Sequence, residues 1–194
     1  PYLYSSMMLN AGELSNRGFE ALVNINAVQK EEFKWRTGFT FSTNKNKLQN
    51  LSNDQFNVTV PFFNAGYTGE PIQTTTHRVE VGRSVGDFFV WKTVGVDDDG
   101  KWLIESKDGE TIPIANAAPD DRQYYGNGIP DFNLGWNNSF NYKNVDLSFS
   151  FRGAFGHQIL NMTRMYYENP INKAYNVLNT AYDPVYGKTL NNDL

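Results

Sequence analysis

Two long runs of alternating apolar and polar residues, at 131–141 and 145–155, constrain the fold of this chain more than any other feature. A period of two in neighbouring runs joined by a short turn, here 142–144, predicts an antiparallel hairpin. Each run has about eleven residues, the length of a tilted strand that crosses a bilayer. The residues of the apolar faces are Phe132, Leu134, Trp136, Asn138 and Phe140, then Val145, Leu147, Phe149, Phe151, Gly153 and Phe155.

Alternation alone fits two kinds of protein. A strand of a water-soluble sandwich also alternates, with its apolar face toward the core. Strands of globular proteins are most often about 5–6 residues long, which is about half the length of these runs. The length of the runs therefore favours a membrane barrel, and a soluble β-sandwich stays open as the alternative.

The same alternation occurs earlier in the chain, at 17–27 and 33–43. The opposite face of these runs is polar, apart from Leu22. The short charged segment 28–32 connects them, so the sequence predicts a second long hairpin. The residues of its apolar faces are Phe19, Ala21, Val23, Ile25 and Ala27, then Phe33, Trp35, Thr37, Phe39 and Phe41.

The segment between the two hairpins, 44–129, has a different composition. Asn, Gly, Pro and Asp are scattered through it, and a connection of this length is too long for a simple loop. It is therefore predicted to carry its own small sheet. Short strand-like runs lie at 56–60, 78–81, 87–96 and 102–106.

Two finer expectations concern the connections. The Asp-Gly pair within 97–100 favours a two-residue hairpin loop between the last two strand-like runs. The segment after the second hairpin, 157–194, is expected to form short helical turns at 158–167 and 172–179.

The composition argues against several classes of protein. The 194 residues include no cysteine, so neither a disulfide framework nor a thiolate metal site is expected. The net charge is −4 and the pI is near 5.2, and without a basic stripe no nucleic-acid partner is expected. No apolar run is long enough for a transmembrane helix. The chain does not begin with Met and both ends look cut, so we expect a fragment of a longer protein.

Three blocks of the chain resemble SusC/RagA-type TonB-linked outer-membrane transporters, and they occur in the order found in that family. Together they cover most of the segment 10–161. The blocks are NAGELSNRGFEALVNINAVQKEEFKWRTGFTFSTNKNKLQNLS, GRSVGDFFVWKTVGVDDDGKW and GNGIPDFNLGWNNSFNYKNVDLSFSFRGAFGHQILN.

The resemblance implies an all-β fold of antiparallel, long-stranded hairpins that form part of a large outer-membrane β-barrel of about 22 strands. The chain, 1–194, would be a C-terminal fragment of that barrel. Because such barrels have short periplasmic turns and long external loops, the segments 44–129 and 157–194 would lie outside the cell.

The same resemblance implies a function and partners. The protein would import oligosaccharides or peptides across the bacterial outer membrane. It would act with a SusD-like surface lipoprotein, with outer-membrane lipid around it and with the TonB complex through regions outside this chain. Neither a cofactor nor an enzymatic activity is expected, and a soluble β-sandwich carbohydrate-binding module is the alternative function.

Several short motifs suggest chemistry without the context that it needs. Residues 82–86 fit G-x-S-x-G, the nucleophile elbow of serine hydrolases, but an elbow precedes a helix and 87–91 is predicted to be a strand. An esterase is therefore the least favoured function. Residues 97–100 resemble part of a calcium loop but do not match the EF-hand spacing, so a solvated hairpin tip is favoured. His77 and His157 are too few and too far apart to indicate a metal or catalytic site.

The aromatic residues of 44–129 are the candidate binding residues. Aromatic rings with Asp and Asn nearby suit sugar or peptide ligands, because a ring can stack while polar groups hydrogen-bond. Among them Trp91, Trp102 and Tyr125 are the strongest candidates, since large amphipathic rings dominate contact energies. The alternative is that the rings form the core of the loop's own sheet. The rings selected as candidates are Tyr67, Phe88, Phe89, Trp91, Trp102, Tyr124 and Tyr125.

Overall fold

The computed structural model describes residues 12–53, 57–70, 72–169 and 176–191. Almost all of the regular structure in these ranges is antiparallel β-sheet, so the all-β prediction is confirmed. Within them, every helix is too short or too polar to cross a membrane.

The chain divides into two compact units, each made of three segments. The first unit holds the four long strands, and the second holds most of the segment between the hairpins together with the end of the chain. Their bounds are Pro1–Phe62, Val79–Val85 and Asn127–Gln158 for the first, and Phe63–Arg78, Gly86–Gly126 and Ile159–Leu194 for the second.

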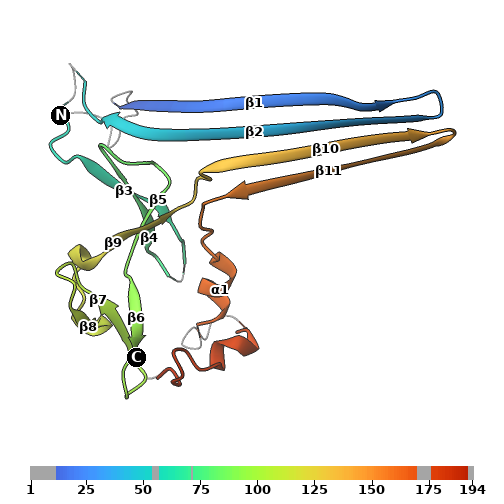
Figure 1. Ribbon diagram of the computed structural model, residues 1–194. Coiled ribbons are helices and arrows are strands. Elements are labelled where there is room, and N and C mark those ends of the chain that lie inside the picture. The colour runs from blue at the N-terminus through green and yellow to red at the C-terminus, as the bar shows by residue number, and fades with distance from the viewer. Residues whose placement is uncertain (1–11, 54–56, 71, 170–175, 192–194) are drawn as a thin grey trace. The chain divides into compact units, whose positions relative to one another are not determined.

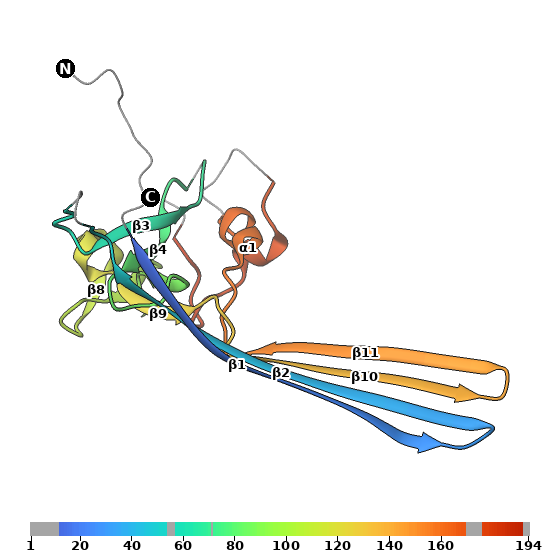
Figure 2. The ribbon, with the colours of Figure 1, turned by 90° about the horizontal axis from the view of Figure 1, so that it is seen from above.

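The first unit is a four-stranded sheet in the order β1-β2-β10-β11. Its strands are β1 (Glu13–Gln29), β2 (Phe33–Asn50), β10 (Phe132–Tyr142) and β11 (Val145–Phe155). Figures 1 and 2 show the two predicted hairpins side by side, with their short turns at the same end of the sheet. The hairpins are joined by the antiparallel pairing of β2 with β10.

The first hairpin is longer than the sequence indicated. β1 has 17 residues and β2 has 18, compared with 11 in each strand of the second hairpin. Pairing continues past the last apolar residues, as Arg17↔Lys45 and Ser15↔Lys47. The predicted ranges 17–27 and 33–43 ended where the alternating apolar residues end. Backbone hydrogen bonding between strands needs no apolar side chains, so the pairing continues through polar residues.

A second difference lies near the turn end of β1. The register shifts between Asn26 and Val28, and Val28 then pairs with Trp35. Val28 therefore shares the face of Trp35, a position that alternation alone had given to Ala27. A bulge of this kind inserts one extra residue into one strand of a pair.

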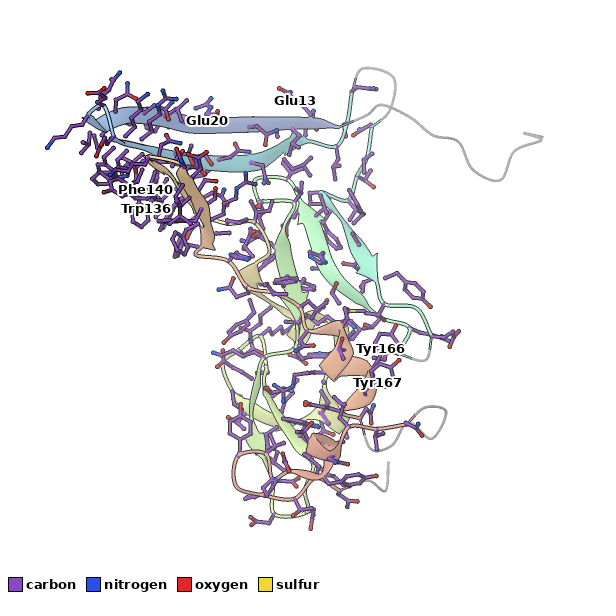
Figure 3. All side chains as sticks on the ribbon, turned by 90° about the vertical axis from the view of Figure 1, so that its right-hand side faces the viewer. Glu13, Glu20, Trp136, Phe140, Tyr166 and Tyr167 are labelled. Carbon is purple, nitrogen blue, oxygen red and sulfur yellow. The ribbon has the colours of Figure 1, made fainter. Side chains whose placement is uncertain are left out.

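One side of the sheet, here called the aromatic face, is a continuous layer of rings and aliphatic chains. Trp136 lies between Phe39 and Phe151, with ring centroids 6.0 and 5.8 Å away, and Phe140 is stacked on Trp35 at 5.5 Å. Figure 3 shows Trp136 and Phe140 on the same side of β10. Cross-strand aromatic pairs of this kind stabilise a sheet. The face comprises Phe19, Ala21, Val23, Ile25, Val28, Phe33, Trp35, Thr37, Phe39, Phe41, Phe132, Leu134, Trp136, Asn138, Phe140, Tyr142, Val145, Leu147, Phe149, Phe151 and Phe155.

The aromatic face is uncovered. Phe19, Leu147 and Phe151 expose 60%, 58% and 59% of their surface. A sandwich would bury this face under a second sheet, and a contiguous apolar surface of this size marks a contact with membrane or protein. The opposite side, here called the polar face, carries small and polar residues such as Ser148 and Ser150.

Two polar residues interrupt the aromatic face, and both are buried. Thr37 and Asn138 pair with each other across β2 and β10 and expose only 8% and 4% of their surface. The indole Nε1 of Trp35 donates to Asn138 Oδ1 at 3.1 Å, and that of Trp136 donates to Thr37 Oγ1 at 2.8 Å. Both indole N–H groups are therefore satisfied within the sheet, and the face presents mainly carbon.

The second unit is built on two small sheets, as predicted for the segment between the hairpins. A four-stranded sheet has the order β3-β4-β5-β9, and a three-stranded sheet has the order β6-β7-β8. Ile104, Phe88 and Phe89 are buried. The strands are β3 (Phe62–Tyr67), β4 (Thr75–Glu80), β5 (Asp87–Val90), β6 (Thr93–Val96), β7 (Trp102–Glu105), β8 (Thr111–Pro113) and β9 (Gln123–Asn127), and the helices are η1 (Ile114–Asn116), η2 (Pro119–Asp121), α1 (Met162–Tyr167) and η3 (Asn179–Tyr182).

Several short predictions for this region were wrong. Residues 57–60 form no strand, and β3 begins after Pro61. Proline has no backbone N–H to donate to a strand ladder, so Pro61 separates residues 57–60 from β3. Residue 56 lies outside the described residues. The run 87–96 is two strands, because the chain passes from one sheet to the other at Trp91 and Lys92. A short apolar run in the sequence does not show which of two sheets each part of the run will join.

The expected loop and helices also differ in detail. The hairpin loop between β6 and β7 has three residues, 98–100, rather than two. Asp97 N donates to Lys101 O and closes the loop, and Gly100 has φ +79°. That glycine suits the third position of a three-residue loop. α1 begins at Met162 rather than 158, because the Asn161 side chain caps it by accepting from Arg164 N at 2.9 Å. Within the expected turn 172–179, residues 172–175 lie outside the described residues and 176–178 are not helical.

Thr37→Val tests the role of the buried polar pair. The substitution leaves the Trp136 indole N–H without its acceptor, so the free energy of unfolding should fall by about 1–3 kcal/mol. Denaturant unfolding of the full-length protein in detergent would measure it. Thr40→Val, at an exposed position on the polar face of the same strand, should change stability by less than about 0.5 kcal/mol. Equal effects at both positions would contradict this role.

Candidate functional site

Trp91 meets Arg122 where β5 ends and β9 begins. The guanidinium carbon of Arg122 lies 4.4 Å from the centroid of the indole ring. Its Nη2 donates to Thr74 Oγ1 at 2.9 Å, and Trp91 Nε1 donates to the Ala118 carbonyl at 3.4 Å. Trp91 still exposes 36% of its surface. The ring is thus fixed from one side and open to a ligand on another.

The charge of Arg122 is not balanced locally. Burial lowers the pKa of Arg122, and the nearby Arg78 cation lowers it further. Within the described part of the chain, Arg122 forms no ion pair. A cation without an ion pair favours a ligand that carries negative charge or several hydrogen-bond acceptors.

Phe89 and Tyr124 lie beside this pair but serve packing. Phe89 exposes only 5% of its surface. Its ring centroid is 5.1 Å from that of Tyr124, and the Arg78 guanidinium lies 3.6 Å above it. For these two rings the core interpretation holds.

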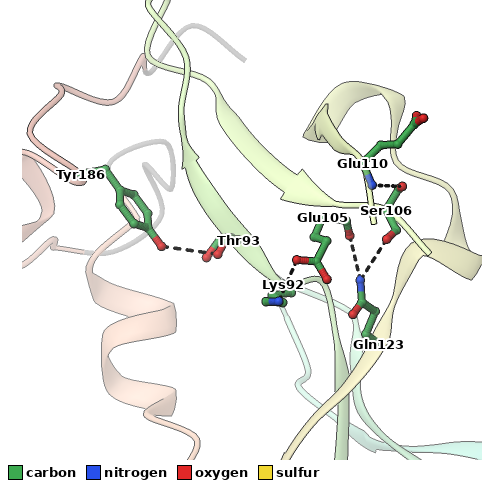
Figure 4. A network of polar contacts seen from close by, with 7 residues as sticks. All are labelled: Lys92, Thr93, Glu105, Ser106, Glu110, Gln123 and Tyr186. Atoms are coloured by element: carbon green, nitrogen blue, oxygen red, sulfur yellow. Dashed lines mark hydrogen bonds and ion pairs between the residues drawn. The ribbon is translucent and has the colours of Figure 1, made fainter. Parts of the chain in front are cut away.

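Tyr125 is the most exposed of the three candidates, at 58%. It belongs to β9, next to an ion pair in which Lys92 Nζ lies 2.7 Å from Glu105 Oε2. Gln123 Nε2 donates to the carbonyls of Glu105 and Ser106, both at 3.1 Å (Figure 4). These contacts fix the polar groups around an uncovered phenol ring, which is an arrangement suited to a ligand with many hydroxyl or amide groups.

The electrostatics of this network follow from its hydrogen bonds. The bond to Glu105 raises the pKa of Lys92, with a smaller contribution from Tyr125. The same bond lowers the pKa of Glu105. Both groups therefore stay charged over the physiological range and act as fixed hydrogen-bonding groups rather than as proton donors or acceptors.

Trp102 is separated from the other two candidates. It is half-buried at the start of β7, paired with Val96 in the three-stranded sheet. The neighbouring hairpin tip contacts a distant segment: Lys188 Nζ lies 2.7 Å from Asp98 Oδ1, and Asn191 N donates to Gly100 O at 2.9 Å. The predicted solvated tip is therefore partly covered, while Trp91 and Tyr125 are brought to the same pair of strands.

The other motifs carry no site in the described residues. A strand, β5, follows residues 82–86 instead of a helix, and Ser84 Oγ bonds Asn46 Oδ1 at 3.0 Å. Asp97 Oδ1 accepts from the backbone of Asp99 and Lys101, so it closes the tip. The described ranges contain no group of three or more acidic, His or Cys side chains that could hold a metal. His77 packs on Phe88 at 4.7 Å, and burial lowers the pKa of His77.

Sequence reasoning missed Arg122 and the Lys92–Glu105–Gln123 network. Both depend on the adjacency of β5 and β9 in one sheet and on the start of the second sheet at Thr93. No local pattern in the sequence indicates either adjacency, so the signal was absent rather than overlooked.

Comparison with known proteins gives a consistent picture. The chain is 32% identical over 173 residues to TonB-dependent receptor P3 of Formosa agariphila, covering 82% of this chain and 17% of that protein. It is 26% identical over 171 residues to TonB-dependent receptor SusC of Bacteroides thetaiotaomicron, covering 88% of this chain and 16% of that protein. No model of a protein family matches the chain.

Solved structures agree on the fold. The RagAB peptide transporter matches with a TM-score of 0.65 at 18% identity, covering 95% of this chain and 21% of that one. RagAB in its closed-closed state matches with the same TM-score over 82% of this chain and 17% of that one. The chain spans about one sixth of the length of the curated relatives it matches. It therefore belongs to the SusC/RagA-type TonB-dependent receptors and corresponds to a fragment of such a protein.

Proposed function

We propose that this chain is a segment of the β-barrel of a TonB-dependent importer in the bacterial outer membrane. The observation that carries the proposal is the uncovered aromatic face. β10 and β11 have 11 residues each. At roughly 3.3 Å per residue and a tilt near 45°, such strands span about 25 Å, the height of the apolar band of an outer-membrane barrel.

The direction of the strands follows from their connections. β1 and β2 are joined by 30–32, and β10 and β11 by 143–144. Lys143 N donates to Glu32 O at 2.9 Å, so the two turns lie together. Short turns face the periplasm in such barrels, so the long segment between β2 and β10, which carries Trp91 and Tyr125, would face outward.

The substrate would be an oligosaccharide or a peptide, received together with a SusD-like surface lipoprotein that covers the outer face. Support comes from Trp91 with its unbalanced Arg122, and from Tyr125 beside the Lys92–Glu105 pair. Energy would come from the TonB complex through regions outside this chain. A soluble β-sandwich module is disfavoured, because it would not leave the aromatic face bare.

Arginine substitutions on the two faces test the membrane assignment. Phe149 lies near the middle of β11 on the aromatic face, and Ser148 lies next to it on the polar face. In the full-length receptor, Phe149→Arg should lower the free energy of unfolding by about 2–4 kcal/mol, because it places a charge in the bilayer. Ser148→Arg should cost much less. Urea titration of receptor refolded in lipid vesicles would measure both, and equal costs would refute the assignment.

The three candidate aromatics can be tested for ligand contact in the intact receptor. Replacing Trp91, Trp102 and Tyr125 by Ala should weaken association with the lid lipoprotein or its ligand by about tenfold or more, the effect of losing an anchoring ring. Growth on the imported nutrient should slow accordingly. Gel migration before and after heating would show that the barrel still assembles.

Single variants sharpen this test. Tyr125→Ala should affect binding with little effect on stability, because the ring is exposed, whereas Trp91→Ala also removes the Arg122 contact. Tyr182→Ala, which removes another ring that is 62% exposed, should leave binding and uptake unchanged. If all three candidate rings can be lost without effect, they serve only loop packing.

A further inference from the structure

The aromatic face ends in a cluster of cations. On β2, Phe41 and Thr43 are followed at the same spacing by Lys45 and Lys47, and on β1 Arg17 pairs directly with Lys45. Residues directly opposite each other in an antiparallel pair share one face. These three cations therefore continue the aromatic face beyond its apolar part, at the end away from the short turns.

A fourth cation is held at the same place by backbone pairing. Leu48 N donates to Arg83 O at 2.9 Å, and Gly82 N donates to Leu48 O at 2.8 Å. Ser84 Oγ also bonds Asn46 Oδ1 at 3.0 Å. The turn after β4 is thus held along the edge of β2, with Arg83 beside Leu48.

These residues surround a pocket of about 570 Å³, here called the basic pocket. None of the described residues that line it is acidic, and Arg17, Lys45 and Lys47 form no ion pair in the described part of the chain. The pocket is lined by Ser15, Arg17, Lys45, Asn46, Lys47, Gln49, Gly82, Arg83 and Ser84.

An apolar groove lies a short distance along the same face. It has a volume of about 440 Å³ and is lined by residues that include Ala21, Phe41 and Trp136. Ala21 pairs with Phe41, four positions from the Arg17↔Lys45 pair, which is roughly 13 Å along a strand. A cationic pocket and an apolar groove in this order match the two ends of one amphipathic molecule.

We propose that the basic pocket binds the anionic phosphate headgroup of a lipid in the outer leaflet, with its acyl chains on the aromatic face. The inference rests on the membrane position proposed above. Guanidinium groups bind phosphate oxygens in a bidentate manner, and lysines add point charges. A cation cluster at the boundary between apolar and polar surface lies at headgroup depth, where such clusters attract anionic lipid. That depth favours a lipid over an acidic protein segment.

Native mass spectrometry of the full-length receptor in detergent would test the proposal. Phosphatidylglycerol and phosphatidylcholine would be added in equal amounts, and the ratio of bound lipids measured. The native receptor should prefer phosphatidylglycerol. The variant Arg17→Gln, Lys45→Gln, Lys47→Gln should lose that preference by about tenfold or more, because each cation near an anionic lipid surface contributes about a fivefold factor.

A matched control removes the same charge near the short turn of the first hairpin, away from both the basic pocket and the apolar groove. Lys30→Gln, Lys34→Gln, Arg36→Gln alters the same sheet and should keep the preference. An equal loss in this control would overturn the proposal, because bulk charge would then explain the result. Displacement of the lipid by excess inorganic phosphate would indicate a free-anion site and would also overturn it, as would capture of an acidic peptide in preference to lipid.

The experiment separates this inference from the proposed function. Migration before and after heating first establishes that each variant forms a barrel. A receptor that never inserts into membranes would refute the membrane assignment itself. An inserted triple variant whose lipid preference equals that of the native receptor would refute only the basic pocket.

Discussion

The pairing of β2 with β10 is the interaction on which the rest of the first unit depends. It joins two hairpins that are separated in the sequence by residues 51–131. The pairing runs from Asn133↔Ser42 to Tyr142↔Phe33. Without it each hairpin would expose two edges of unpaired backbone, which neither water-soluble proteins nor membranes tolerate well. Loop-closure entropy grows only slowly with loop length, so a long insertion between the paired strands costs little.

The same pairing makes a face of rings compatible with a membrane. An indole N–H in hydrocarbon needs a hydrogen-bond acceptor. Asn138 and Thr37 supply acceptors to Trp35 and Trp136 only because β2 and β10 are adjacent and in this register. A shift by one residue would turn both polar side chains to the other face. The two polar residues in the apolar pattern thus specify the register as well as satisfying the tryptophans.

The sequence predicted the long strands well because their signal is local and repeated. The range 145–155 coincides with β11, and 131–141 lies within one residue of β10. It underestimated β1 and β2, because apolar alternation stops at Phe19 and Phe41 while the backbone ladder continues. In the second unit the runs were short, and which sheet each strand joins was undetermined. The split of 87–96 at Trp91 and the contact of Trp91 with Arg122 both follow from that choice of partners.

The aromatic residues of this chain show why residue type alone does not assign a role. In the strands, exposed rings such as Phe151 form one continuous layer, and the proposed membrane position accounts for their exposure. In the second unit, Phe89 and Tyr124 are packed against each other, so fold stability accounts for them. Trp91 contacts the Arg122 cation and is still partly exposed. Tyr125 remains: it is 58% exposed, lies outside the apolar layer and is close enough to Lys92 to raise the pKa of that amine. Packing gives no reason for a large exposed ring at that position, so the proposed contact with a ligand is the role that its surroundings favour.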